Sequence, residues 1–177
     1  MLHFLRDGVS KDKDRLKKLS EKYSVSEDAF DFFHDSLGDE FWMAEQAECF
    51  GKLLSTIGLY MLVENETKII LRWIFSEKQV SKSYIWKNLK KTLNGIGFNI
   101  EHLKMYKIIN ELRCLNNDIK HNRKVGDELA KYPGWVYGEE ITGKEINFER
   151  FKNAVPEYIE ELSNGINAQL LKTKAIK

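Results

Sequence analysis

The side chains most able to do chemistry lie between Asn110 and Asn122. If this segment is helical, residues three or four positions apart share a face. That rule places four polar residues in one stripe, here called the polar stripe: Asn110, Arg113, Asn117 and His121. Arginine and lysine hold phosphate groups, and histidine is easily poised for proton transfer near neutral pH. Arg113 and Lys120 are therefore candidate phosphate contacts, and His121 is the candidate for proton transfer.

These residue types suit metal-independent RNA cleavage. That reaction needs a group that assists the 2′-hydroxyl or the leaving oxygen, and cations that stabilise charge at phosphorus. Asn117 can orient either the imidazole or the phosphate. A histidine next to a lysine at a helix end also interacts favourably with the helix dipole, so a solvated polar face stays open as an interpretation. Leu103 and Tyr106 continue the polar stripe upstream and indicate that a partner chain covers part of it.

Composition limits the kinds of function that need to be considered. Of the 177 residues, 42% are hydrophobic and 31% charged, which predicts one folded domain over residues 1–177. The 28 Lys and Arg nearly balance the 27 Asp and Glu, so any contact with nucleic acid must be local. Cys49 and Cys114 lack metal-ligand spacing, and no signal peptide or membrane span is evident. The sequence predicts a cytoplasmic protein with no metal, no cofactor and no membrane contact.

The fold class follows from the scarcity of helix breakers. Only two prolines and 11 glycines occur, which favours a mainly α fold. We expect an antiparallel helical bundle built on two long helices, 39–76 and 100–122, with a loop or short β-hairpin over 123–146 before the last helix. The expected parts are N-terminal surface helices in 1–38 (11–23 and 28–37), a core bundle in 39–122 that includes a helix at 82–93, and a C-terminal helix in 147–177 that Asn147 caps.

One stripe of the long helix 39–76 is expected to be its buried face: Met43, Ala47, Phe50, Leu54, Ile57 and Met61. Continued along the helix, the stripe reaches Glu64 and Lys68, which are one turn apart and able to pair. Two alternatives remain at this point. Either the helix rotates, so that Leu62, Val63, Ile70 and Trp73 face the core and Glu64 points to water, or Glu64 lines a polar cleft.

The segment LRCLNNDIKHN at 112–122 resembles the HEPN superfamily of small α-helical proteins. The resemblance implies a bundle that dimerises, with a composite ribonuclease site made by paired motif helices. The family motif is an Arg, four to six residues and a His, usually with a polar residue straight after the Arg. His121 matches the His and Arg113 is the upstream Arg, but seven residues separate them and Cys114 follows the Arg. Asn117, Lys120 and His121 match an Asn-x-x-Lys-His variant of the family.

Together, the residues and the resemblance predict a HEPN-like homodimer that acts on RNA as a metal-independent endoribonuclease, in a toxin or defence setting with a possible antitoxin. In this hypothesis His121, Arg113 and Asn117 are catalytic, and the substrate contacts are Lys120, Asn122, Asn110 and Glu64. The alternative is a non-catalytic HEPN-like module in which the polar stripe recognises a partner protein or a nucleotide. A third possibility places function in the loop at 126–146, because loops commonly carry recognition.

Overall fold

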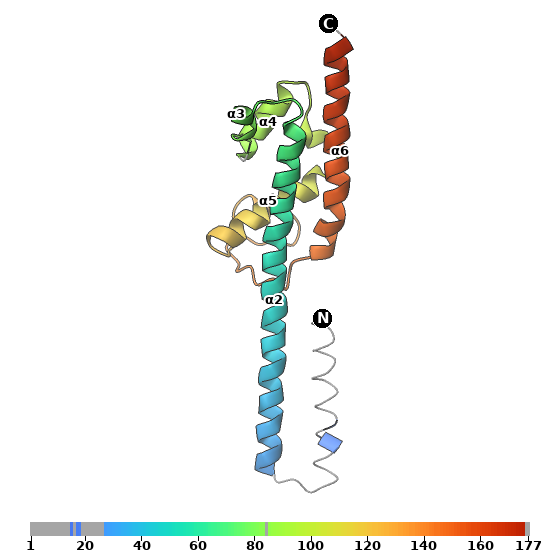
Figure 1. The fold of residues 1–177 in the computed structure, drawn as a ribbon. Helices are drawn as coiled ribbons and strands as arrows, with labels where there is room; N and C mark the ends of the chain where they lie inside the picture. Colours follow the sequence, from blue (N-terminus) through green and yellow to red (C-terminus); the bar gives the residue numbers. More distant parts are fainter. Residues whose placement is uncertain (1–14, 16, 19–26, 84, 176–177) are drawn as a thin grey trace. The chain divides into compact units, whose positions relative to one another are not determined.

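A computed structural model describes residues 15, 17–18, 27–83 and 85–175 of the chain. The predicted surface helix at 11–23 falls almost entirely outside these residues. The described part is mainly α-helical, as predicted, and contains five α-helices (Figure 1): α2 (Glu27–Leu71), α3 (Glu77–Val80), α4 (Trp86–Asn94), α5 (Tyr106–His121) and α6 (Phe148–Ala175). Two 3-10 turns, η1 (Ile100–His102) and η2 (Leu129–Lys131), flank α5. None of the described helices has an apolar stretch long enough to cross a membrane.

The chain divides into two compact units, Met1–Lys52 and Leu53–Lys177, and the division falls inside α2. In the first unit the described chain is mostly the N-terminal half of α2. Its Cys49 is buried, whereas the predicted core residues Met43, Ala47 and Phe50 are exposed. The second unit carries the other helices and every candidate site residue.

The helices predicted at 28–37 and 39–76 form one continuous helix, because α2 runs through Gly38 and ends at Leu71. An interior glycine lowers helix stability by only about 1 kcal/mol, which neighbouring turns can offset. After turns at 72–75, the Ser76 amide donates to Gln79 Oε1 at 3.1 Å and α3 begins. The prediction that a long helix continues to residue 76 was therefore wrong by about one turn.

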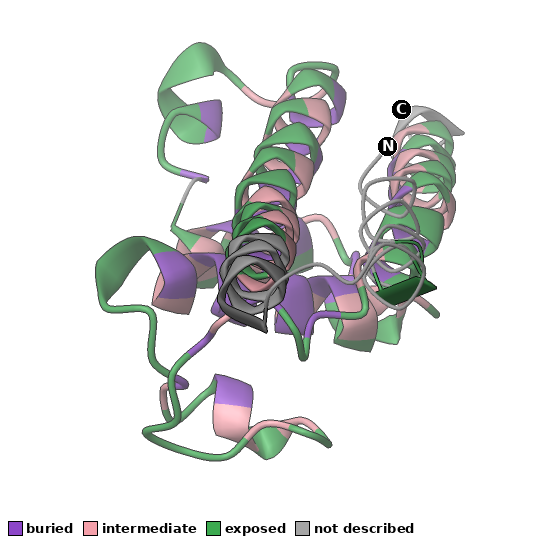
Figure 2. Cartoon of the chain, turned by 90° about the horizontal axis from the view of Figure 1, so that it is seen from below, coloured by how far each residue is buried: buried purple, intermediate pink, exposed green. Residues whose placement is uncertain are grey.

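The buried face of α2 differs from the predicted one. In the second unit the residues that face the core are Leu53, Thr56, Tyr60, Val63, Thr67 and Ile70. They step by three and four residues, as a packed helix face requires. Leu54 and Met61, predicted to be buried, are 53% and 50% exposed, and Ile57 is half-buried. Figure 2, which views the chain from below, shows buried and exposed residues on opposite sides of α2.

The core of the second unit is built mainly where α5 meets α6. Ile109, Leu112 and Leu115 of α5 are fully buried, and so are four residues of α6: Phe151, Tyr158, Leu162 and Ile166. The prediction that Asn147 caps this last helix is confirmed, since Arg150 N donates to Asn147 Oδ1 at 3.1 Å. Figure 1 shows α6 running in the same direction as the part of α2 in this unit. The helix predicted over 100–122 begins at Tyr106 and lies across α2 instead of running antiparallel along it.

The segment at 123–146 forms no strand, so the predicted hairpin option was wrong. Its one isolated bridge joins Lys124 and Glu140 in the described structure. Backbone hydrogen bonds connect the two arms, for example from Ile141 N to Arg123 O at 2.8 Å. Positive φ angles at Arg123, Gly138 and Gly143 interrupt the extended conformation that a strand needs.

Replacing Gly165 by alanine is expected to destabilise the second unit. A Cβ at Gly165 would clash with the ring of Phe98, lying 2.8 Å from Cζ and closer still to Cε2. Overpacking of this kind costs about 1–3 kcal/mol, which exceeds the gain of about 1 kcal/mol from replacing a helical glycine. Urea unfolding measures the change. Gly58→Ala is the matched control, because its Cβ would meet nothing within 4 Å and the substitution should raise stability. Equal stabilisation by both substitutions would contradict the close packing of Phe98 on α6.

Candidate functional site

Helix α5 carries the polar stripe, and the turn after it is held by Asp118. The Asp118 carbonyl accepts from Arg123 N at 2.8 Å, and the Asp118 carboxylate accepts from Gly126 N at 2.7 Å. A Cβ at Gly126 would lie 2.9 Å from Asp118 Oδ1, so any larger residue there would have to displace the Asp118 carboxylate. Together these bonds set where α5 ends and where His121 lies.

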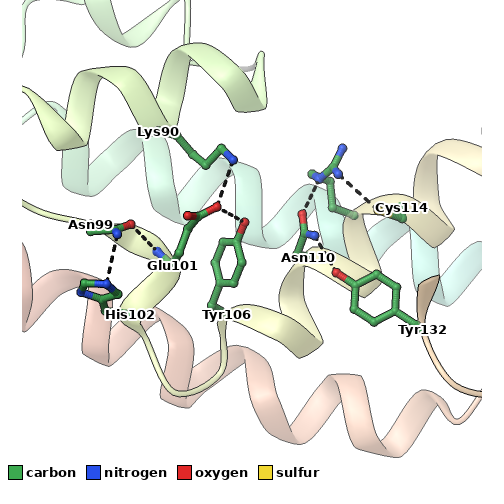
Figure 3. A network of polar contacts seen from close by, with 9 residues as sticks. Lys90, Asn99, Glu101, His102, Tyr106, Asn110, Cys114 and Tyr132 are labelled. Atoms are coloured by element: carbon green, nitrogen blue, oxygen red, sulfur yellow. Dashed lines mark hydrogen bonds and ion pairs between the residues drawn. The ribbon is translucent and has the colours of Figure 1, made fainter. Parts of the chain in front are cut away.

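Arg113 is fixed by a network at the N-terminal half of the polar stripe. Its Nε donates to Asn110 Oδ1 at 2.9 Å, and its Nη2 donates to Cys114 Sγ at 3.2 Å. The guanidinium carbon also lies 5.4 Å from the centroid of the Trp86 ring, a cation–π distance. Asn110 in turn donates to the Tyr132 hydroxyl at 2.6 Å, as Figure 3 shows. Arg113 is half-buried, and two of its five N–H donors are directed at protein groups.

Cys114 is not an activated nucleophile in this environment. Burial raises the pKa of its thiol, and the opposing effect of the neighbouring Arg113 charge is smaller. A thiol with a raised pKa stays protonated near neutral pH and is a poor nucleophile. The role of Cys114 in the described structure is to accept a hydrogen bond from Arg113.

The C-terminal half of the polar stripe is exposed. Lys120 and His121 are exposed side chains, and neither forms a hydrogen bond or ion pair with a described residue. Asn122 is also exposed and accepts from Lys124 N at 3.1 Å through its Oδ1. Asn117, one turn before His121, is half-buried and accepts from Asn116 Nδ2 at 3.3 Å.

A single chain does not bring Arg113 and His121 together. Eight residues along a helix correspond to about 12 Å along its axis and about 80° of rotation. The Nε of Arg113 bonds to Asn110, which lies on the side of Arg113 away from His121. The predicted residues thus form two groups, a fixed one around Arg113 and Asn110 and an exposed one at Asn117, Lys120, His121 and Asn122.

Each of the two alternatives left open by the sequence holds in part. Glu64 is half-buried and lines a pocket between α2 and α4, as in the second. Of the residues that the first alternative turns to the core, Val63 and Ile70 are buried, whereas Leu62 and Trp73 are exposed.

The pocket is small, with a cavity volume of about 20 Å³, and its walls include Tyr60, Val63, Glu64, Lys68, Trp86 and Leu89. A cavity of this size holds about one water molecule. No ion pair joins Glu64 and Lys68, which are both described. Burial raises the pKa of the Tyr60 hydroxyl, and the Glu64 charge adds to this. Trp86 connects this pocket to the fixed group around Arg113, because it lines the pocket and also packs on Arg113.

Sequence reasoning missed a second polar cluster, around Glu111. Glu111 is only 3% exposed, accepts from Trp135 Nε1 at 2.9 Å and pairs with Arg150 Nη2. Arg150 is partly exposed, and its guanidinium carbon lies 4.7 Å from the centroid of the Phe151 ring. The sequence does hold a signal for this cluster, because Glu111 is a charged residue one turn before the buried Leu115. Trp86 and Tyr132 were missed as partners of Arg113 and Asn110, because their contacts are not local in sequence.

The sequence was compared with protein-family models, with curated proteins and with solved structures, and none of them matches this chain.

Proposed function

We propose that this chain is a HEPN-like protein that cleaves RNA without a metal ion, with His121 as the proton-transfer residue. The observation that carries the proposal is the exposed C-terminal half of the polar stripe. There, His121 and Lys120 are both accessible and unpaired among the described residues, and Asn117 lies one turn before them on α5. An imidazole beside a phosphate-binding cation is the minimum set for transfer chemistry at a phosphodiester.

In this proposal the neutral imidazole of His121 accepts the proton of an RNA 2′-hydroxyl. The 2′-oxygen then forms a bond to phosphorus, and the bond from phosphorus to the 5′-oxygen breaks. The products are a 2′,3′-cyclic phosphate and a 5′-hydroxyl, which takes up a proton. Lys120 stabilises the negative charge that builds up on the phosphate oxygens, and Asn117 and Asn122 orient the strand.

Arg113 has a different role from the one that the sequence predicts. Its hydrogen bonds to Asn110 and Cys114 and its packing on Trp86 suit a positioning residue that holds α5 against α4. We therefore treat Arg113 and Asn110 as residues that position the helix. A cation that contacts the phosphate opposite Lys120 would come from a second copy of the chain.

We also propose that the protein works as a homodimer. In the second unit, α2 is apolar on two opposite sides. One side faces the core, and the other exposes a row of large apolar residues: Leu54, Met61, Leu62 and Ile69. Trp73, in the turn just after the helix, is exposed as well. Exposed apolar rows of this kind mark interaction surfaces. A toxin or defence setting and an antitoxin or other protein partner belong to the same proposal, and they rest on the resemblance at 112–122.

Replacing His121 by alanine is expected to lower the rate of RNA cleavage by at least 100-fold, the usual contribution of a positioned acid or base. The measurement follows single-stranded RNA on a denaturing gel in the presence of a chelator. His102→Ala is the matched control, because His102 is an exposed histidine on η1, outside the polar stripe. Normal cleavage by His121→Ala would remove His121 from the mechanism.

The second candidate function is a binding module without turnover, and the separation of Arg113 from His121 favours it. This candidate predicts that RNA stays intact with the wild-type protein but shifts in a gel, and that Lys120→Ala weakens the shift. Multiple-turnover cleavage by the wild type and by His102→Ala, but not by His121→Ala, would reject it.

A further inference from the structure

Positive charge is concentrated in one stretch of the chain. Residues 68–97 contain seven Lys or Arg and one Asp or Glu, so this stretch carries a net charge of +6, while the whole chain carries +1. The rest of the chain is therefore net negative. A charge asymmetry of this kind is typical of proteins with a local surface for a polyanion. The stretch contains α3 and α4 and lies entirely in the second unit.

Few of these charges are neutralised within the described structure. Arg72 pairs with Glu77 at 2.8 Å, and Lys90 pairs with Glu101 at 3.0 Å. The other lysines of the stretch form no ion pair with a residue that the structure describes. Four of these lysines are exposed and are here called the lysine group: Lys78, Lys82, Lys87 and Lys91.

Two members of the lysine group weaken the helix that carries them. Helix α4 has three lysines and no acidic residue. Lys87 lies in its first turn, where the helix dipole disfavours a positive charge, and Lys87 and Lys91 are like charges one turn apart. Both lie on the side of the helix away from the buried Leu89 and Leu93. A charge arrangement that breaks local rules without a compensating residue in the helix is expected where the surface serves a function.

We propose that the lysine group binds the phosphate backbone of single-stranded RNA, an inference that rests on the proposed action on RNA. Exposed lysines displace the counterions of a nucleic acid, which gives affinity without sequence preference. An anionic membrane surface also attracts lysines, but a helix that binds a membrane inserts its apolar face. The apolar face of α4 is buried in the core through Leu89 and Leu93, so a bilayer has no access to it.

Contacts between α4 and α5 connect the lysine group to the polar stripe. Trp86, which precedes Lys87, stacks on Tyr106 of α5 with the ring centroids 6.1 Å apart, and it also packs on Arg113. From Arg113, His121 lies about 12 Å further along the axis of α5. A strand of a few nucleotides that lies on α4 can therefore reach His121.

The test measures how the full chain binds a fluorescently labelled 2′-O-methyl RNA at several salt concentrations. This strand has no free 2′-hydroxyl, so it reports binding without cleavage. Affinity for a single strand falls with salt, and each phosphate that the protein neutralises adds about 0.7 to the slope of log affinity against log salt concentration. We expect the double variant Lys87→Gln and Lys91→Gln to lower this slope by about 1.4, and to lower the affinity at about 0.1 M salt at least ten-fold.

Two control variants separate the lysine group from a general effect of charge. The double variant Lys152→Gln and Lys172→Gln removes two exposed lysines from α6 and should leave the slope unchanged. The double variant Lys87→Arg and Lys91→Arg keeps both charges and should keep the wild-type slope. Equal losses in the two glutamine variants would mean that only the net charge of the protein matters, and would overturn the inference.

Other results would overturn the inference in different ways. An unchanged slope in the α4 glutamine variant, or no binding of RNA by the wild type at low salt, would reject the lysine group as an RNA contact. Binding to vesicles that contain phosphatidylserine, but not to RNA, would assign the lysine group to a membrane surface. If the expected losses occur in a protein that leaves ordinary RNA intact, only the nuclease proposal is rejected. If ordinary RNA is cleaved but the slope is unchanged, only this inference is rejected.

Discussion

Replacing Arg150 by methionine is expected to lower the free energy of unfolding of the second unit by about 3–5 kcal/mol, the cost of leaving a buried charge without its partner. The carboxylate of Glu111 is 3% exposed, and Arg150 is its cationic partner. Without Arg150, the carboxylate keeps only the hydrogen bond from Trp135 Nε1 at 2.9 Å. Methionine preserves the apolar part of the side chain that packs near Phe151, so the change isolates the charge. Urea unfolding followed by circular dichroism gives the difference.

Three further variants separate this pair from ordinary surface pairing. Glu111→Gln should be less destabilising than Arg150→Met, because it leaves Arg150, which is partly exposed and can be hydrated. The double variant should recover part of the loss, since it removes both charges. Lys152→Met removes an exposed partner of Glu149 on the same helix and should cost about 0–1 kcal/mol. If Arg150→Met were no more harmful than Lys152→Met, Glu111 would not depend on Arg150.

Ile70→Ala is expected to lower the free energy of unfolding by about 2–5 kcal/mol, whereas Ile69→Ala should change it by less than about 1 kcal/mol. The two isoleucines are neighbours on α2 with 3% and 45% of their surfaces exposed. Both changes remove the same atoms from the same helix, so helix propensity cancels and only burial differs. Denaturant unfolding at low protein concentration makes the comparison. Similar losses at both positions would contradict the buried face described for α2.

The exposed apolar row on α2, which includes Ile69, gives a test of the proposed homodimer. Ile69→Asp places a charge among the exposed apolar residues without touching the core. The mass in solution, measured by light scattering, should fall from that of two chains to that of one, while the fold is retained. A dimer that survives Ile69→Asp would have its interface elsewhere, and a monomeric wild type would reject the homodimer.

Local sequence rules predicted the helices best where one face alone is apolar. The helix at 100–122 was predicted from residues spaced by three and four, and α5 covers 16 of those positions. Asn147 predicted the start of α6 because its capping hydrogen bond is local. The first six residues of the predicted helix, 100–105, are not α-helical. Ile100 to His102 form a 3-10 turn, and a further turn leads into α5. Such ends depend on a few bonds and are hard to place from periodicity.

The buried face of α2 was not predictable from spacing, because the helix is apolar on two sides. The stripe through Leu54 and Met61 and the stripe through Leu53 and Tyr60 differ by one residue, or about 100° around the helix. Periodicity alone cannot tell which of these two stripes is buried. The tertiary structure does, because the stripe through Leu53 and Tyr60 belongs to the core cluster that α4, α5 and α6 share. The loop at 123–146 was misread for a similar reason, since its β-branched residues suit strands while its glycines adopt positive φ angles.

For the candidate site, the sequence predicted which residues share a face but not what each one contacts. Asn110 and Arg113 do lie together on α5, three residues apart and hydrogen-bonded. Their further partners, Trp86 and Tyr132, come from segments about 20 residues or more away in sequence. Those contacts hold Arg113 in place and leave Lys120 and His121 as the accessible end of the stripe, a division that spacing alone could not reveal.

The central claim is that His121 promotes metal-free attack of an RNA 2′-hydroxyl. The chemistry of the product ends tests it most directly. Wild-type protein is incubated with a short single-stranded RNA in excess chelator, and the masses of the fragments are measured by mass spectrometry. We predict fragments that end in a 2′,3′-cyclic phosphate and begin with a 5′-hydroxyl, and none of them with His121→Ala. Fragments with 5′-phosphates, or the same cyclic ends from His121→Ala, would contradict the account.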